Sequence, residues 1–83
     1  MFFVYILQSI SDKSYYIGCT ENLKKRFTEH NKGLSKYTRN KRPWEVLYFE
    51  RFSLLSQARK REKQIKSWKK RSAIEKLIHA PVV

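Results

Sequence analysis

The sequence predicts an α+β fold, a small three-stranded antiparallel sheet flanked by helices in the order β-β-α-β-α-α. Three observations lead to this prediction. Three runs are rich in aromatic and β-branched residues, as strands are. The segments between and after them place apolar residues at helical spacing or carry turn signals. The chain has only 83 residues, so we expect one domain over 1–83, because domains typically contain about 100 to 150 residues.

The first two strands are predicted over Phe2–Ser9 and Tyr15–Thr20. The five residues between them, 10–14, are mostly polar and predict the turn of a hairpin. Since Phe2–Ser9 is apolar at nearly every position, we expect both of its faces to be covered and the strand to be central. Gly18 inside the second strand indicates a bulge or a close approach of another group.

A first helix is predicted over about residues 21–32, with Thr20 as its N-cap and Gly33 as its C-terminal stop. Its apolar stripe is narrow, and Arg26 and His30 lie on the adjoining stripe, four residues apart. The two side chains therefore share one side of the helix.

A polar, basic loop is predicted over 34–42, followed by a third strand over Trp44–Phe52. A second, longer helix then begins with Ser53 or Ser56 as its cap and runs to about Lys69.

A third, short helix follows. Ser72 and Glu75 have the spacing of a capping box, which predicts its first turn.

Glu62 is the one residue that breaks the amphipathic pattern of the second helix. It stands four residues after Ala58 and three before Ile65, so it lies on the inward apolar stripe. A carboxylate there requires a partner or a function.

The charge of the chain indicates what kind of partner it attracts. Lys and Arg number 19 against 7 Asp and Glu, which leaves a formal net charge of +12. A compact domain with this charge attracts polyanions. Nucleic acid is the first expectation, an anionic membrane surface the second, and simple solubility the third. The chain has no apolar run of about 18 residues that predicts a membrane span. Cys19 is its one cysteine, which excludes an internal disulfide, and we expect a cytoplasmic protein.

The scarcity of reactive side chains excludes several classes of enzyme. One Asp, six Glu and two His are too few and too scattered for a multi-carboxylate two-metal centre or a histidine-rich metal site. The sequence has no glycine-rich phosphate loop. What remains for chemistry is one carboxylate, tyrosines, an arginine and one histidine.

With this set of reactive residues, the sequence resembles the GIY-YIG endonuclease domain, most closely its small stand-alone bacterial members. The resemblance covers about residues 2 to 78. It is carried in order by the segments VYILQS, YYIGCT, LKKRFTEHN and ARKREKQIKSW.

The resemblance implies a set of functional positions. They are the motif tyrosines Tyr5 and Tyr16, the motif glycine Gly18, Arg26 and His30 on the first helix, and the metal-binding Glu62. Phe3 and Val4 stand where the family name has Gly and Ile.

The implied chemistry is hydrolysis of a phosphodiester bond in DNA with one divalent ion, Mg²⁺ or Mn²⁺, at Glu62. Arg26 is expected to grip a phosphate oxygen. His30 and Tyr16 compete for the role of the base that activates water, and Tyr5 would position the water or the phosphate. No small-molecule cofactor is expected.

Contacts with duplex or branched DNA are expected from the basic loop, because it interleaves basic residues with a tyrosine and hydroxyls. Its candidate contact residues are Lys36, Tyr37, Arg39, Lys41 and Arg42. The substrate is either a DNA structure recognised by the chain alone or a site to which a targeting protein directs it.

Other interpretations remain open at this level. Composition alone allows Tyr5 and Tyr16 to be ordinary strand aromatics and Arg26 and His30 to form a solvated helix face. It also allows Glu62 to make only surface ion pairs. The alternative functions are a nucleic-acid-binding module that retains the nuclease fold without catalysis, and a module that binds an acidic protein.

Overall fold

A computed structural model describes residues 1–79, which form a three-stranded antiparallel sheet with the strand order β2-β1-β3. Strand β1 (Phe2–Ser9) lies in the centre, and β2 (Tyr15–Thr20) and β3 (Trp44–Phe52) are the edge strands. The expected central position of the first strand is confirmed.

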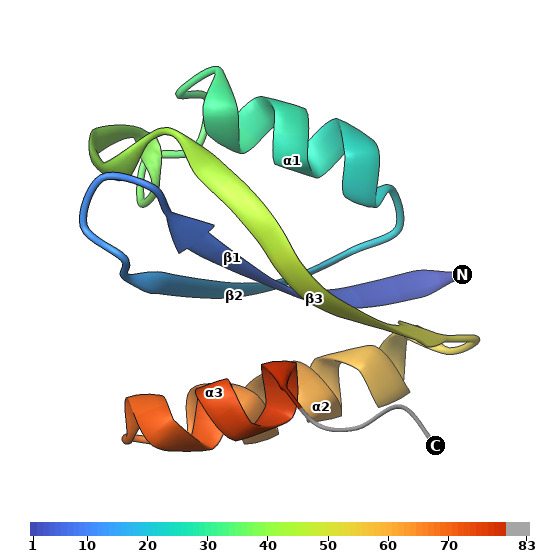
Figure 1. Cartoon of the computed structure of the whole chain (residues 1–83). Helices are drawn as coiled ribbons and strands as arrows, with labels where there is room; N and C mark the ends of the chain where they lie inside the picture. Colours follow the sequence, from blue (N-terminus) through green and yellow to red (C-terminus); the bar gives the residue numbers. More distant parts are fainter. Residues whose placement is uncertain (80–83) are drawn as a thin grey trace.

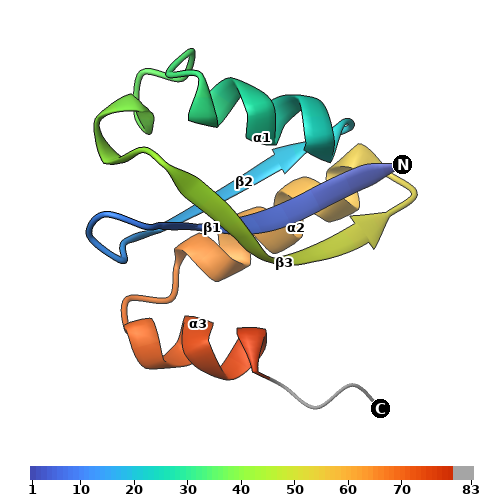
Figure 2. The same ribbon diagram turned by 45° about the horizontal axis from the view of Figure 1, so that its top comes forward.

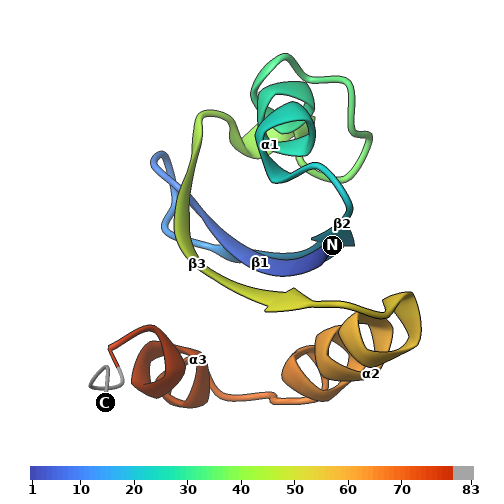
Figure 3. The same ribbon diagram turned by 90° about the vertical axis from the view of Figure 1, so that its right-hand side faces the viewer.

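The helices cover both faces of the sheet. Helix α1 (Leu23–Asn31) lies over one face, and α2 (Leu55–Lys66) and α3 (Arg71–Ile78) lie over the other (Figures 1 and 3). A short 3-10 helix, Arg39–Lys41, precedes β3. The order β-β-α-β-α-α is as the sequence predicts, with the 3-10 turn as an addition.

The pleat of β1 divides the interior into two clusters, because successive side chains of a strand point to opposite faces. An aliphatic cluster on the α2 and α3 side contains Val4, Ile6, Ala58, Ile65 and Ile74. A second cluster on the α1 side contains Tyr5, Leu7 and Trp44, with Tyr16, Leu23, Phe27 and Val46 packed against them. The motif tyrosines therefore belong to the α1 side.

The start of α1 differs from the expected one. Its N-cap is Asn22, whose Oδ1 accepts a hydrogen bond from the backbone N–H of Lys25 at 3.0 Å. Thr20 is the last residue of β2, so it is two residues too early to cap the helix. Gly33 is confirmed just beyond the helix end, with a φ of 79° that favours glycine.

The expected cap of α2 is wrong. The N-cap is Leu54, which has extended backbone and no side-chain cap, so neither Ser53 nor Ser56 fills this position. The helix ends at Lys66 and not near Lys69, because the chain turns there toward α3 (Figure 2).

The predicted capping box of α3 is also wrong. Lys70 is the N-cap and Ser72 is already inside the first turn. A capping hydroxyl must lie on the residue with extended backbone before the helix, and Lys70 has that conformation.

No helix within residues 1–79 combines the length and the apolar character that crossing a bilayer requires.

Candidate active site

Tyr5 reaches across the sheet because its neighbour on β2 is a glycine. The two residues are paired in the β1–β2 register, and β2 has no further strand beyond it. A Cβ added to Gly18 would lie 2.3 Å from the Tyr5 hydroxyl oxygen. Of the two explanations offered for Gly18, the close approach is therefore confirmed, and any side chain there would displace the tyrosine.

His30 is held inside the protein between β1 and the basic loop. Its ring is 0% exposed, with Nε2 3.0 Å from the Tyr5 hydroxyl oxygen and Nδ1 2.7 Å from Oγ1 of Thr38. The solvated-face explanation is wrong for His30. Thr38 was not among the expected site residues, since a threonine in a polar loop carries no distinguishing sequence signal.

Tyr16 completes an aromatic cluster around the histidine. Its ring centroid lies 4.9 Å from that of His30 and 6.3 Å from those of Tyr5 and Trp44. Unlike Tyr5 and His30, Tyr16 is only partly buried. Of the two tyrosines, it is the more exposed.

Arg26 lies one turn before His30 on α1 and is partly exposed. Its Nη1 is 3.4 Å from a carboxylate oxygen of Glu29, and its charge acts on both Tyr5 and His30. The guanidinium therefore stands beside the buried pair with part of its surface open to solvent.

Burial sets the protonation of the pair. It raises the pKa of Tyr5 to about 12, an effect that Tyr16 reinforces and Arg26 opposes. Burial also lowers the pKa of His30 to about 4, with Arg26 adding to the effect. At neutral pH Tyr5 thus retains its proton and His30 is uncharged, so the interior holds a neutral hydrogen-bonded pair.

Glu62 approaches from the opposite side of the sheet. Its side chain is only 15% exposed, and its carboxylate is 3.0 Å from Nζ of Lys66. Burial is the main cause of the raised pKa values of the Cys19 thiol and of Tyr5, and the negative charge of Glu62 adds to both. The inward position that the sequence indicates is confirmed. The alternative, in which Glu62 makes only surface ion pairs, accounts for its contact with Lys66 but not for its burial.

The donor set limits the kind of metal site. Among residues 1–79, no three His, Cys, Asp or Glu side chains converge to hold an ion, so a cage of several such ligands is excluded there. Mg²⁺ usually takes one or two carboxylates and completes its shell with water and substrate phosphate. One mostly buried glutamate fits that requirement.

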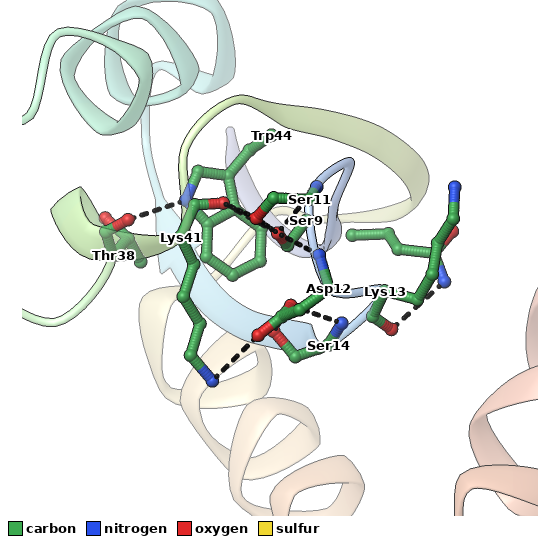
Figure 4. A network of polar contacts seen from close by, with 9 residues as sticks. Ser9, Ser11, Asp12, Lys13, Ser14, Thr38, Lys41 and Trp44 are labelled. Carbon is green, nitrogen blue, oxygen red and sulfur yellow. Dashed lines mark hydrogen bonds and ion pairs between the residues drawn. The ribbon is translucent and has the colours of Figure 1, made fainter.

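The basic loop is fixed from beneath. Ser35 and Thr38 are buried, and the indole N–H of Trp44 donates to the backbone oxygen of Thr38 at 2.9 Å. The hydroxyl of Ser9 donates to the backbone oxygen of Lys41 at 2.6 Å, joining the loop to the hairpin turn (Figure 4). The loop is thus anchored through its backbone oxygens.

The expected DNA-contact residues form the outer surface of this loop. All five are exposed, and Tyr37 is 83% exposed; they are Lys36, Tyr37, Arg39, Lys41 and Arg42. Two of them have partners on the protein. Nζ of Lys41 lies 3.5 Å from the Asp12 carboxylate, and Nε of Arg42 donates to the backbone oxygen of Arg39 at 2.7 Å.

The structure thus gathers Tyr5, Tyr16, Arg26 and His30 on the α1 side of β2. Glu62 lies on α2, on the other side of the sheet. The charge of Glu62 acts on Tyr5 of β1 and on Cys19 of β2. The candidate site therefore includes these two strands and the helices on either side of them.

Comparison with known proteins agrees with this arrangement. The model of the GIY-YIG catalytic domain matches residues 1–76. A UPF0213 protein of Syntrophus aciditrophicus is 47% identical over 77 residues, which cover 90% of this chain and 84% of that protein. A UPF0213 protein of Natronomonas pharaonis is 44% identical over 66 residues, covering 78% of this chain and 76% of the relative.

A solved structure is also similar. The solution structure of the UPF0213 protein BH0048 from Bacillus halodurans has a TM-score of 0.58 and 29% identity, covering 93% of this chain and 83% of that one. The chain therefore belongs to the GIY-YIG catalytic domain family, and specifically resembles its small UPF0213 members, which implies a nuclease-type function.

Proposed function

We propose that this protein is a metal-dependent endonuclease that hydrolyses phosphodiester bonds in DNA. The observation that carries the proposal is the mutual packing of Tyr5, Tyr16 and His30, with Tyr5 over the glycine of an edge strand and Arg26 beside them. Such a set requires no second carboxylate, and the chain offers no dense carboxylate cluster among residues 1–79.

Accessibility separates the two candidate bases. Both ring nitrogens of His30 already have protein partners and the ring has no exposed surface, so an attacking water cannot reach it. Tyr16 keeps part of its surface open. We therefore assign the water-activating role to Tyr16 and a supporting role to His30.

The remaining roles follow from charge. Arg26 would bind a non-bridging phosphate oxygen and offset the charge that develops on it. Glu62 would hold the divalent ion, which when bound supplies Lewis-acid stabilisation of the departing oxygen. The exposed basic loop and the +12 charge support binding to the DNA backbone, which contributes affinity more than sequence preference.

One observation favours a second candidate, a nucleic-acid-binding module without catalysis. Lys66 occupies one carboxylate oxygen of Glu62 at 3.0 Å, and an ion would have to compete with this ammonium group. Whether DNA is cleaved or only bound decides between the two candidates.

The test is a cleavage assay on supercoiled, branched and single-stranded DNA with Mg²⁺ or Mn²⁺, run beside a binding assay at several salt concentrations. We expect Glu62→Gln and Tyr16→Phe each to lower the cleavage rate by about 100-fold or more, the scale of losing one group that stabilises a transition state. DNA affinity should stay within about twofold, because neither substitution removes a positive charge.

The matched control is Glu75→Gln, which alters an exposed glutamate of α3 and should cleave at the wild-type rate. Cleavage that survives Glu62→Gln would remove the metal-binding role of Glu62. Wild-type protein that binds DNA and cuts none of the substrates would establish the second candidate.

A further inference from the structure

A continuous chain of hydrogen-bonding groups links the basic loop to the motif tyrosine through the protein interior. Thr38 Oγ1 lies 2.7 Å from Nδ1 of His30, and Nε2 of the same ring lies 3.0 Å from the Tyr5 hydroxyl. Thr38 and His30 are 0% exposed and Tyr5 is 1% exposed. Bulk water therefore does not interrupt the chain.

The protonation of this chain allows two arrangements. Because His30 is neutral at pH 7, only one ring nitrogen carries a hydrogen. If Nε2 carries it, Thr38 donates to Nδ1 and the ring donates to the Tyr5 oxygen. If Nδ1 carries it, the ring donates to Thr38, and Tyr5 donates inward to Nε2. In each arrangement one hydroxyl hydrogen, that of Tyr5 or that of Thr38, is left outside the chain.

The surroundings of the two hydroxyls decide where that hydrogen is tolerated. The hydroxyl of Thr38 is fully enclosed and, within residues 1–79, has a ring nitrogen of His30 as its one hydrogen-bond partner. Leaving its hydrogen unpaired costs about 1–3 kcal/mol. The Tyr5 hydroxyl is nearly as buried but has further polar neighbours. Arg26 hydrogen-bonds to it, and the negative charge of Glu62, which lies on the other side of the sheet from His30, attracts its hydrogen.

We infer that Thr38 is a positioning residue that holds His30 in the Nε2–H form, so that the Tyr5 hydroxyl hydrogen points away from the histidine and toward the candidate site. Tyr5 then receives a hydrogen bond from His30 and directs its own hydrogen away from that ring. The catalytic consequence rests on the proposed function, whereas the direction of the chain does not.

The position of Thr38 gives this device a second consequence. The residue lies between the exposed Tyr37 and Arg39, and the Trp44 indole fixes its backbone oxygen. The loop proposed to contact DNA and the Tyr5 hydroxyl are thus joined by one buried chain of hydrogen bonds.

The test is ¹⁵N NMR of histidine-labelled protein at pH 7, in a His79→Gln background that leaves His30 as the one histidine. We expect a protonated Nε2 and an unprotonated Nδ1. Thr38→Val should move the Nδ1 resonance downfield, toward that of an imidazole nitrogen without a hydrogen bond, and Thr38→Ser should restore it. A wild-type ring protonated at Nδ1, or an Nδ1 resonance unchanged in Thr38→Val, overturns the inference.

The functional arm uses the same variants. Thr38→Val should lower the DNA cleavage rate about tenfold, the scale of one lost hydrogen bond, with affinity within about twofold, and Thr38→Ser should recover most of the rate. An equal loss in both variants would contradict the positioning role. If the wild type cleaves no DNA, the proposed function fails while the NMR measurement still decides the direction of the chain. If Thr38→Val does not fold, the wild-type ring and Thr38→Ser decide it.

Discussion

The two faces of the sheet use opposite means to fill the interior. Below β1, Val4 and Ile6 meet aliphatic side chains of α2 and α3. Above it, Tyr5 meets the buried polar groups of His30 and Thr38. One strand of alternating side chains thus separates an aliphatic layer from a layer that holds most of the proposed catalytic side chains.

The polar layer is stable because its groups are paired. Among residues 1–79, every buried side-chain nitrogen and oxygen has a hydrogen-bond partner. The aliphatic layer needs fewer such contacts, and its principal polar link is on its border. There Arg61 of α2 donates to both carboxylate oxygens of Glu50 on β3, at 2.9 and 3.0 Å.

The largest expected effect tests whether the two layers are separable. Ile74→Ala on α3 should lower the free energy of unfolding by about 2–4 kcal/mol, because it removes a buried side chain and leaves a cavity. Cleavage measured well below the new melting temperature should be unchanged. Urea unfolding followed by circular dichroism gives the stability.

The counterpart on the other face is Tyr5→Phe, which should cost only about 1 kcal/mol for its lost hydrogen bond yet reduce cleavage at least about tenfold. If Ile74→Ala impaired cleavage as strongly as Tyr5→Phe, stability and chemistry would not be divided between the two faces.

A smaller effect is expected at the glycine that admits Tyr5. Gly18→Ala places a methyl group 2.3 Å from the Tyr5 hydroxyl oxygen and 2.4 Å from its ring carbon. Because this ring is buried and cannot swing into solvent, we expect a loss of about 2–3 kcal/mol in unfolding free energy. The measurement is again urea unfolding.

Gly33→Ala is the matched control. It meets the guanidinium end of Arg42, a flexible side chain, and suffers mainly from its positive φ. Its cost should be about 1 kcal/mol. Equal losses at the two glycines would show that the packing of Tyr5 is not what requires Gly18.

Each pH unit is expected to change stability less than the Gly18 substitution does, in a pH dependence that belongs to the polar layer. The pKa of His30 is about 4 in the folded protein against 6.5 for an ordinary histidine. Between these values the unfolded chain binds a proton that the folded chain does not. Stability therefore rises with pH in this window and is lost as pH falls from 6.5 toward 4, by up to about 1.4 kcal/mol per pH unit.

The check is a series of urea unfolding curves between pH 7 and pH 4. His30→Gln should flatten the slope in this window, since the glutamine does not titrate. A slope that persists in His30→Gln would assign the pH dependence to other groups.

The sequence by itself determined the order of the elements and the central position of the first strand. It also singled out Glu62, because a carboxylate on an apolar stripe is visible without coordinates. The motif tyrosines and Gly18 are equally local features, since strand pairing follows from the adjacent hairpin.

The residues that cap the helices could not be predicted from the sequence. Thr20, Ser53, Ser56 and Ser72 all have the hydroxyl that capping requires, and none of them caps a helix. Which residue keeps extended backbone before the first turn depends on how the helix packs on the sheet.

Only the tertiary structure decided which polar residues are buried together. Arg26 and His30 share one stripe of α1, yet the histidine is enclosed and the arginine is partly open. Thr38 is eight residues from His30 in sequence and joins it only because the loop folds back beneath α1 and is held by Trp44. Hydrogen bonds of this kind form only where separate elements pack together, so the periodicity within one element does not predict them.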